Sequence, residues 1–168
     1  KMIKIAQELE AAGAEMILIC ANTMHQMAPE VQANLKIPLL HIADAAAEKI
    51  KADAYKKVGL LGTKYTMEGD FYKNRIEENY GIDVLIPGAE DRDLIHRVIY
   101  QELVSGILKK ESREKFKEII ADLEKKGAEA VILGCTEIPL LIKDEDSSLP
   151  IFNTTELHAK KAVEFALE

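Results

Sequence analysis

The sequence predicts an α/β fold of two pseudosymmetric lobes, each a parallel sheet flanked by helices. Two observations support this prediction. Short apolar segments alternate with segments of helical length, and such alternation with short connections is typical of parallel sheets. A segment near the N-terminus also recurs near the C-terminus, and two copies of one unit indicate two related lobes rather than a solenoid.

The N-terminal third alternates between helical and extended patterns. Apolar residues recur on a helical period at its start, and Gly13 follows at the position favoured after a helix C-terminus. The next segment is short and wholly apolar, as expected for a strand buried on both faces. Pro29 suits the first turn of a further helix. The elements predicted here are helix 1–12, strand 16–20, helix 29–35, strand 37–40 and helix 44–54.

The following residues continue the alternation. Gly62-Thr63 forms a turn after a short apolar strand, and Gly81 ends an amphipathic helix. A long helical region is expected to break near Gly106 and to restart at Ser112. The predicted elements are strand 58–61, helix 67–80, strand 83–86, helical region 91–126 and strand 130–133.

The internal repeat relates residues 9–15 (LEAAGAE) to residues 123–129 (LEKKGAE), and an apolar strand follows each copy. A fainter echo relates residues 37–40 to residues 149–152. Equivalent strand ends of the two lobes are therefore expected to face one crevice, where open α/β sheets usually bind ligands. Superposing the copies places Ala21 opposite Cys135.

The composition argues against several classes of protein. The formal net charge of −7 disfavours a nucleic-acid-binding surface, which needs an excess of Lys and Arg. No run approaches the ~20 apolar residues that a membrane span needs. The two cysteines have no CxxC spacing and the four histidines no metal-ligand spacing, so neither a disulfide scaffold nor a metal site is expected. A soluble, cytoplasmic protein is expected.

Cys135 is the residue best suited to carry chemistry. It lies at the end of a buried strand, after Gly134 and before Thr136, whose hydroxyl and amide can hold a carboxylate. Nearby amides can stabilise the thiolate, which can then abstract a proton or act as a nucleophile. Position alone leaves open the alternative of a cysteine that packs in the core like alanine.

Two further turns follow predicted strands and are candidate anion-binding sites. Asn22-Thr23 can hold a carboxylate, although an ordinary turn or helix cap is the local alternative. The turn at residues 62–66 (GTKYT) is similar but lacks the spacing of a P-loop or of GxGxxG, which makes a nucleotide site a weak interpretation. His25 follows the first turn closely.

Four motifs resemble the successive signatures of aspartate racemases, a branch of the aspartate/glutamate racemase family. They are residues 20–25 (CANTMH), 37–44 (IPLLHIAD), 60–67 (LLGTKYTM) and 134–141 (GCTEIPLL), and their order and spacing agree along nearly the whole chain. The last motif is the most diagnostic. Glutamate racemases usually carry His where Glu137 stands here, so the resemblance favours the aspartate branch, including its broader-specificity members.

The resemblance implies a reaction without a cofactor, in which one base removes the α-proton and a second, facing base delivers a proton to the opposite face. It implies that Cys135 is one of these bases. It implies that the amino acid is bound by Asn22, Thr23, Thr63, Thr136 and Glu137.

The second base position is occupied by Ala21, which cannot exchange a proton. Cys20 lies one residue earlier, and a single step along a strand points a side chain to the opposite face. The family normally begins with a further strand and a Gly-rich turn, so the resemblance implies a truncated first lobe. The predicted lobes are residues 1–42 with 146–168, and residues 43–145, in a homodimer.

The predicted function is racemisation of aspartate or glutamate, impaired by Ala21. Related alternatives are a hydantoin racemase or an enzyme similar to maleate isomerase. The rival from another class is a non-catalytic protein that uses the same turns to bind an amino acid or another small carboxylate. Neither nucleic acid nor a membrane is an expected partner.

Overall fold

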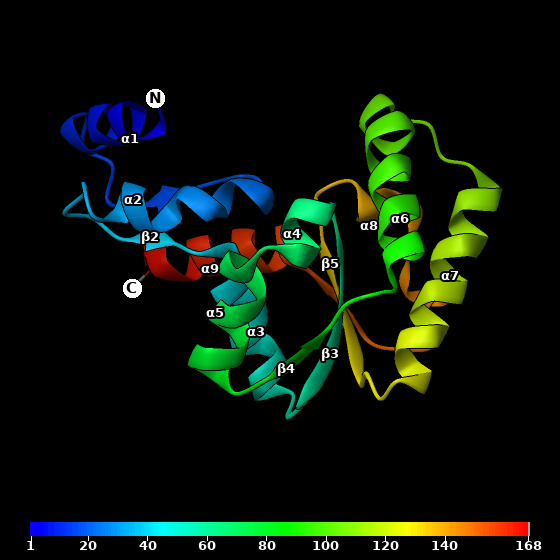
Figure 1. The fold of residues 1–168 in the computed structure, drawn as a ribbon. Coiled ribbons are helices and arrows are strands. Elements are labelled where there is room, and N and C mark those ends of the chain that lie inside the picture. The colour runs from blue at the N-terminus through cyan, green and yellow to red at the C-terminus, as the bar shows by residue number, and fades with distance from the viewer. Residues whose placement is uncertain (168) are drawn as a thin grey trace.

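The computed structural model describes residues 1–167, which form two parallel sheets surrounded by helices (Figure 1). The smaller sheet pairs β1 with β2, and the larger has the order β4-β3-β5-β6. The predicted α/β class is confirmed.

The first lobe contains the smaller sheet. Its elements are α1 (Met2–Ala11), β1 (Ile17–Leu18), the 3₁₀ helix η1 (Thr23–Met27), α2 (Ala28–Gln32) and β2 (Leu39–Leu40). Its apolar cluster is small, with Ala6, Ile17 and Val31 as its buried members.

The second lobe contains the larger sheet and most of the buried apolar residues. Every residue of β5 is buried, and in β3 only Lys57 is not, because helices cover both faces of the sheet. Its elements before β5 are α3 (Ile42–Ala52), β3 (Lys57–Gly62), α4 (Lys64–Glu68), α5 (Asp70–Tyr80), β4 (Asp83–Leu85), α6 (Ala89–Gln101), η2 (Leu103–Ser105) and α7 (Lys110–Lys125). The remaining elements are β5 (Ala130–Gly134), α8 (Ile138–Leu141), η3 (Asp144–Asp146), β6 (Ile151–Asn153) and α9 (Thr154–Leu167).

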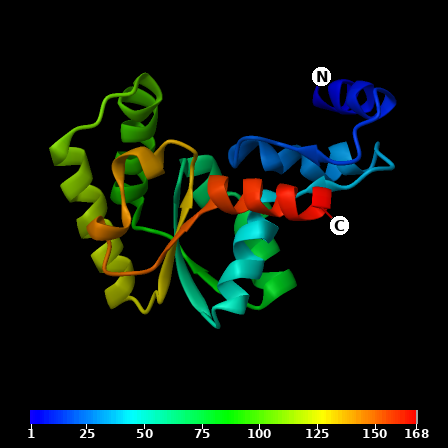
Figure 2. The same cartoon turned by 180° about the vertical axis from the view of Figure 1, so that it is seen from behind.

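Helix α9 connects the two lobes. It packs along α3 on the second lobe and reaches β2 of the first. Figures 1 and 2 show it crossing from the end of the large sheet to the region under α2, with α6 and α7 on the far side of that sheet. Lys161 of α9 forms an ion pair of 2.7 Å with Glu48 of α3.

The repeat found in the sequence is a structural repeat. Gly13 and Gly127 both have a positive φ near 95°, which only glycine adopts without strain, and each ends a helix. The same backbone bond follows in both copies. Ile17 N–H donates to Pro38 O, and Val131 N–H donates to Pro150 O, each at 2.9 Å. Strands β1 and β2 therefore correspond to β5 and β6.

The helix predicted over residues 67–80 is divided in two. It begins early, at Lys64, because Thr63 Oγ1 accepts the N–H of Thr66 and caps α4. It breaks at Gly69, whose backbone is extended. A Cβ at this glycine would lie 2.5 Å from the carbonyl oxygen of Tyr65, so a larger residue would force the chain apart.

The strand in the C-terminal tail belongs to a different sheet from the one predicted. Residues 146–168 were assigned to the first lobe, but β6 pairs with β5 through Val131↔Ile151 and Ile132↔Phe152. The internal repeat explains this pairing, since β6 lies next to β5 as β2 lies next to β1. No helix among residues 1–167 is long and apolar enough to cross a membrane.

Candidate active site

The predicted site residues gather where three parallel strands end. Thr63 follows β3, Cys135 follows β5 and Thr154 follows β6. The first lobe reaches this edge through the turn at residues 22–23. Thr23 Oγ1 lies 2.9 Å from Thr63 Oγ1, and Asn22 Nδ2 donates to Thr154 Oγ1 at 3.1 Å. Since β5 lies between β3 and β6, this turn spans the end of β5, where Cys135 begins the next loop.

Two glycines let the strand ends approach each other. Gly62 pairs with Gly134 across β3 and β5. A Cβ on Gly62 would lie 2.9 Å from the carbonyl oxygen of Gly134, and a Cβ on Gly134 would lie 2.9 Å from Leu60 Cδ1. Glycine is therefore required at position 62, whereas a Cβ at position 134 would require the side chain of Leu60 to shift. The pair places Thr63 and Cys135 at matching positions on neighbouring strands.

Three threonine hydroxyls form one cluster across the two lobes. Thr23 Oγ1 lies 3.0 Å from Thr66 Oγ1, and Thr63 Oγ1 lies 3.2 Å from Thr66 Oγ1, in addition to the contact between Thr23 and Thr63. Two hydrogen bonds suffice to link three hydroxyls, so the third proton can turn toward a bound carboxylate. Thr66 belongs to the candidate anion-binding turn predicted over residues 62–66, although the predicted substrate-binding residues do not include it.

Asn22 presents a hydrogen-bond acceptor without a partner. Its side chain is 4% exposed, and its Oδ1 has no partner among the described residues. The orientation of the amide follows from Thr154, which donates its proton to Leu133 O at 2.8 Å and so can only accept from Asn22 Nδ2. A buried carbonyl oxygen is costly to leave unpaired, and a ligand N–H, such as that of an ammonium group, would satisfy it.

The thiol of Cys135 is protonated and directed at a carboxylate. It is 8% exposed, and its Sγ donates to Glu137 Oε2 at 2.9 Å. Burial raises the pKa of Cys135 to about 12, and the Glu137 carboxylate contributes in the same direction. The backbone amides of Glu137 and Thr136 oppose this shift by favouring the thiolate. The thiol is therefore a proton donor in the resting protein.

Ala21 lies at the start of the turn that spans β5, and its methyl group carries no exchangeable proton. Its carbonyl accepts the Nδ1 proton of His25 at 2.9 Å. Cys20, one residue earlier, is exposed, whereas Cys135 is buried.

The side chains of three histidines pack together next to this turn. The ring of His25 lies 4.4 Å from that of His41 and 5.7 Å from that of His158, measured between centroids. His25 donates from Nδ1 and accepts the N–H of Ile42 at Nε2, so it is neutral in one tautomer. His158 Nε2 donates to Leu40 O at 2.8 Å, which ties α9 to β2. The sequence indicated none of these contacts beyond the proximity of His25 to the turn.

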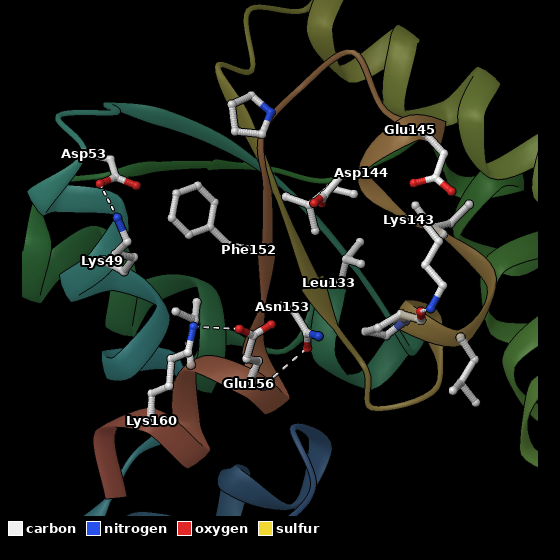
Figure 3. A pocket seen from close by; sticks show the side chains of 16 residues that line it. Lys49, Asp53, Leu133, Lys143, Asp144, Glu145, Phe152, Asn153, Glu156 and Lys160 are labelled. Carbon is white, nitrogen blue, oxygen red and sulfur yellow. Dashed lines mark hydrogen bonds and ion pairs between the residues drawn. The ribbon is translucent and has the colours of Figure 1, made fainter. Parts of the chain in front are cut away.

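A wide cavity of about 800 Å³ lies elsewhere, along the open edge of β6 (Figure 3). Phe152 and Leu133 lie at its floor, and Cys135 and the turn at residues 22–23 do not line it. Two of its lysines are paired within the wall, since Lys160 contacts Glu156 and Lys49 contacts Asp53, and Lys143 Nζ donates to the carbonyl oxygen of Pro139. No group of three or more His, Cys, Asp or Glu residues in the described part of the chain is arranged to hold a metal ion.

Comparison with known proteins gives a consistent result. The family model described as Asp/Glu/Hydantoin racemase matches residues 1–162. The broad specificity amino-acid racemase RacX of Bacillus subtilis (strain 168) is 24% identical over 165 residues, covering 94% of this chain and 67% of RacX. A glutamate racemase of Hydrogenobaculum sp. (strain Y04AAS1) is 30% identical over 143 residues, covering 84% of this chain and 53% of that enzyme. The chain thus spans between half and two thirds of the length of these relatives.

Solved structures show the same fold. A candidate Asp/Glu racemase from Yersinia pestis is 46% identical with a TM-score of 0.95, and an aspartate racemase homologue from Pyrococcus horikoshii OT3 is 43% identical with a TM-score of 0.89. Each comparison covers 99% of this chain and 73% of the other.

Proposed function

Because the chain belongs to the Asp/Glu/Hydantoin racemase family, we propose that it acts on the α-carbon of an amino acid, with aspartate or glutamate as substrate. The proposed reaction is proton removal and return at that carbon without a cofactor. One observation carries the proposal: the turn at residues 22–23 is hydrogen bonded to the strand ends on both sides of Cys135.

The polar groups around Cys135 match the parts of an amino acid. Asn22 Oδ1 accepts from the ammonium group, and the hydroxyls of Thr23 and Thr63, together with Thr136, hold carboxylate oxygens. Cys135 exchanges a proton with the α-carbon from one face. Maleate has no N–H donor for Asn22, whereas a hydantoin ring has, so the buried acceptor disfavours the first of these related substrates.

Ala21 limits the reaction. We place it across the α-carbon from Cys135, because the repeat superposes Ala21 on Cys135 and the resemblance implies a second base at this position. A methyl group cannot take or give a proton, so racemisation is slow, while Cys135 can still remove and return a proton on its own face. Each general acid–base step commonly contributes ~10²–10⁴-fold to a rate, so the loss of one step is large.

The test is to incubate each enantiomer of aspartate and glutamate in deuterium oxide and to follow the α-proton by NMR. Exchange of one enantiomer without formation of the other is expected. Brisk racemisation of both enantiomers would show that Ala21 does not occupy a base position. A Cys20→Ser variant should behave as the parent, because Cys20 is exposed whereas Cys135 is buried in the site.

Restoring a thiol tests the same assignment in the opposite direction. Ala21→Cys should raise the racemisation rate at least ~100-fold over the parent, measured by circular dichroism of L-aspartate. Ala33→Cys, which adds a thiol at an exposed position of the same lobe, is the matched control and should have no effect. Equal rates in the two variants would contradict the two-base arrangement.

A non-catalytic amino-acid-binding protein is the second candidate, and Ala21 is the observation that favours it. In that case neither enantiomer exchanges its α-proton, yet aspartate slows alkylation of Cys135 by iodoacetamide.

A further inference from the structure

We propose that Thr154 is a positioning residue that makes the site selective for ligands with an N–H group at the α-carbon. It acts through Asn22, because it fixes which end of that side-chain amide is offered to a ligand. The inference rests on the proposed function and deepens it. It assigns the discrimination between an amino acid and its deaminated analogue to the first residue of α9.

The hydrogen bonds of Thr154 permit one arrangement of protons. Its side chain is fully buried, and its Oγ1 lies 2.8 Å from Leu133 O, which can only accept. The single proton of the hydroxyl is therefore directed at β5, and a lone pair of Oγ1 faces Asn22 at 3.1 Å. Only the Nδ2 end of an amide can donate to that lone pair, so Asn22 is held with its nitrogen toward Thr154.

The opposite arrangement of the amide is costly. With Oδ1 of Asn22 turned toward Thr154, two acceptors would face each other unless the hydroxyl proton left Leu133 O. That carbonyl would then lose its hydrogen bond to the hydroxyl. Both bonds are buried, so water does not replace either of them, and the amide should keep one orientation.

The amide oxygen is thereby the group left for a ligand. Asn22 is 4% exposed, and its Oδ1 has no partner among residues 1–167. An α-ammonium group supplies the missing donor, whereas succinate and glutarate have no N–H and leave the oxygen unpaired. The protein should therefore bind aspartate more tightly than succinate and glutamate more tightly than glutarate.

The experiment compares these two pairs of ligands in Thr154→Val, which keeps nearly the shape of threonine but has no hydroxyl. Binding to the whole chain is measured by isothermal titration calorimetry, and the readout is the Kd of the diacid divided by the Kd of the amino acid. Without the acceptor at position 154, the amide can turn its Nδ2 toward the ligand. We expect the ratio to fall at least ~5-fold, the smallest effect usual for one unpaired buried polar group.

Three further variants isolate the hydroxyl. Thr154→Ser keeps it and should restore the ratio of the parent. Thr154→Cys offers a thiol, a weaker acceptor, and should give an intermediate ratio, so the test does not depend on the folding of Thr154→Val alone. Thr155→Val makes the same change at the next, exposed position of α9 and should leave the ratio at the parent value.

A lower ratio in Thr154→Val that Thr154→Ser restores supports the proposal. An unchanged ratio in Thr154→Val, even with weaker binding of both ligands, would make Thr154 a merely structural residue and overturn it. A parent that binds each diacid as tightly as its amino acid, or binds none of the four ligands, also overturns it. The proposed function is judged separately by α-proton exchange in deuterium oxide. A parent that prefers the amino acid but exchanges no α-proton fails that function, and the ratios still decide the inference.

Discussion

His25, His41 and His158 form a neutral cluster that holds the first lobe against the second. Burial lowers the pKa of His25 to about 4 and that of His41 to about 2, and the positive charge of Arg75 contributes to both shifts. The hydrogen bonds of His25 are those of a neutral ring, since Nδ1 donates and Nε2 accepts. Protonated His25 would direct a second N–H at the N–H of Ile42, so one contact at the seam between the lobes would become repulsive.

This cluster predicts a loss of stability in weak acid. The folded-state pKa values lie below the ordinary value of 6.5, so unfolded chains take up protons first as the pH falls. Stability is complete above pH 6.5 and decreases as the pH falls from 6.5 toward the folded values. His25 and His41 should each contribute on the order of 2 kcal/mol to the loss between pH 7 and pH 5, measured by urea unfolding.

The variant His41→Asn isolates one histidine. His41 Nδ1 caps α3 by accepting the N–H of Ala43, and Asn153 performs the same task for α9 in the second copy of the repeat. Asparagine should therefore keep the cap and remove the titration, so the variant loses about 2 kcal/mol less than the parent over this interval. An identical pH dependence in both proteins would show that His41 is not buried as a neutral group.

Sequence patterns predicted part of the site. Cys135, Thr63 and the turn at residues 22–23 follow strands, and parallel strands end at one edge, so their meeting was foreseeable. Thr154 was not, because its contact with Asn22 depends on which sheet receives β6. The bond between Cys135 and Glu137 depends on rotamers, which no periodicity encodes.

At the scale of elements, the end of α3 is strained in a way that the corresponding helix ends are not. Ala54 has a φ of 66°, whereas the ends of α1 and α7 use Gly13 and Gly127. The left-handed conformation costs an alanine about 1–2 kcal/mol, and glycine loses about 0.5–1 kcal/mol of chain entropy on folding. The strain of alanine is the larger cost, so glycine should be the more stable residue at position 54.

Ala54→Gly should therefore stabilise the protein by about 0.5–1 kcal/mol in urea unfolding. The control is Ala52→Gly, the same change two residues earlier within α3, where glycine should destabilise by up to about 1 kcal/mol. Opposite signs are expected, and equal signs would mean that Ala54 is not held in the left-handed region.

Element types were predicted well because burial on both faces makes strands continuously apolar and because glycines end several helices. Boundaries were predicted less well. The two strands of the first lobe are shorter than their apolar runs, as β1 covers only Ile17–Leu18 of the predicted 16–20. A run of apolar residues indicates burial, whereas the length of a strand depends on the hydrogen bonds that the neighbouring strand supplies.

At the scale of the whole molecule, the two lobes have unequal cores. The larger cluster contains both long central strands, while the cluster of the first lobe has three buried residues around a sheet of two short strands. Local opening should therefore cost less in the first lobe. Hydrogen exchange by mass spectrometry should show at least about tenfold faster exchange for Ile17 in β1 than for Ile132 in β5. Equal protection would mean that both lobes open as one unit.

The facing pair Gly62 and Gly134 constrains how relatives of this chain can diverge. A Cβ at Gly62 would lie too close to the carbonyl oxygen of Gly134, whereas a Cβ at Gly134 would lie 3.0 Å from the carbonyl oxygen of Leu61 and would require a shift of a few tenths of an ångström. A compensating second change does not help at Gly62, because the obstacle there is a main-chain oxygen that every residue possesses. Position 62 is thus closed to drift for as long as β3 and β5 remain neighbours, and an alignment of relatives should show an invariant glycine there, while position 134 admits at most a small residue.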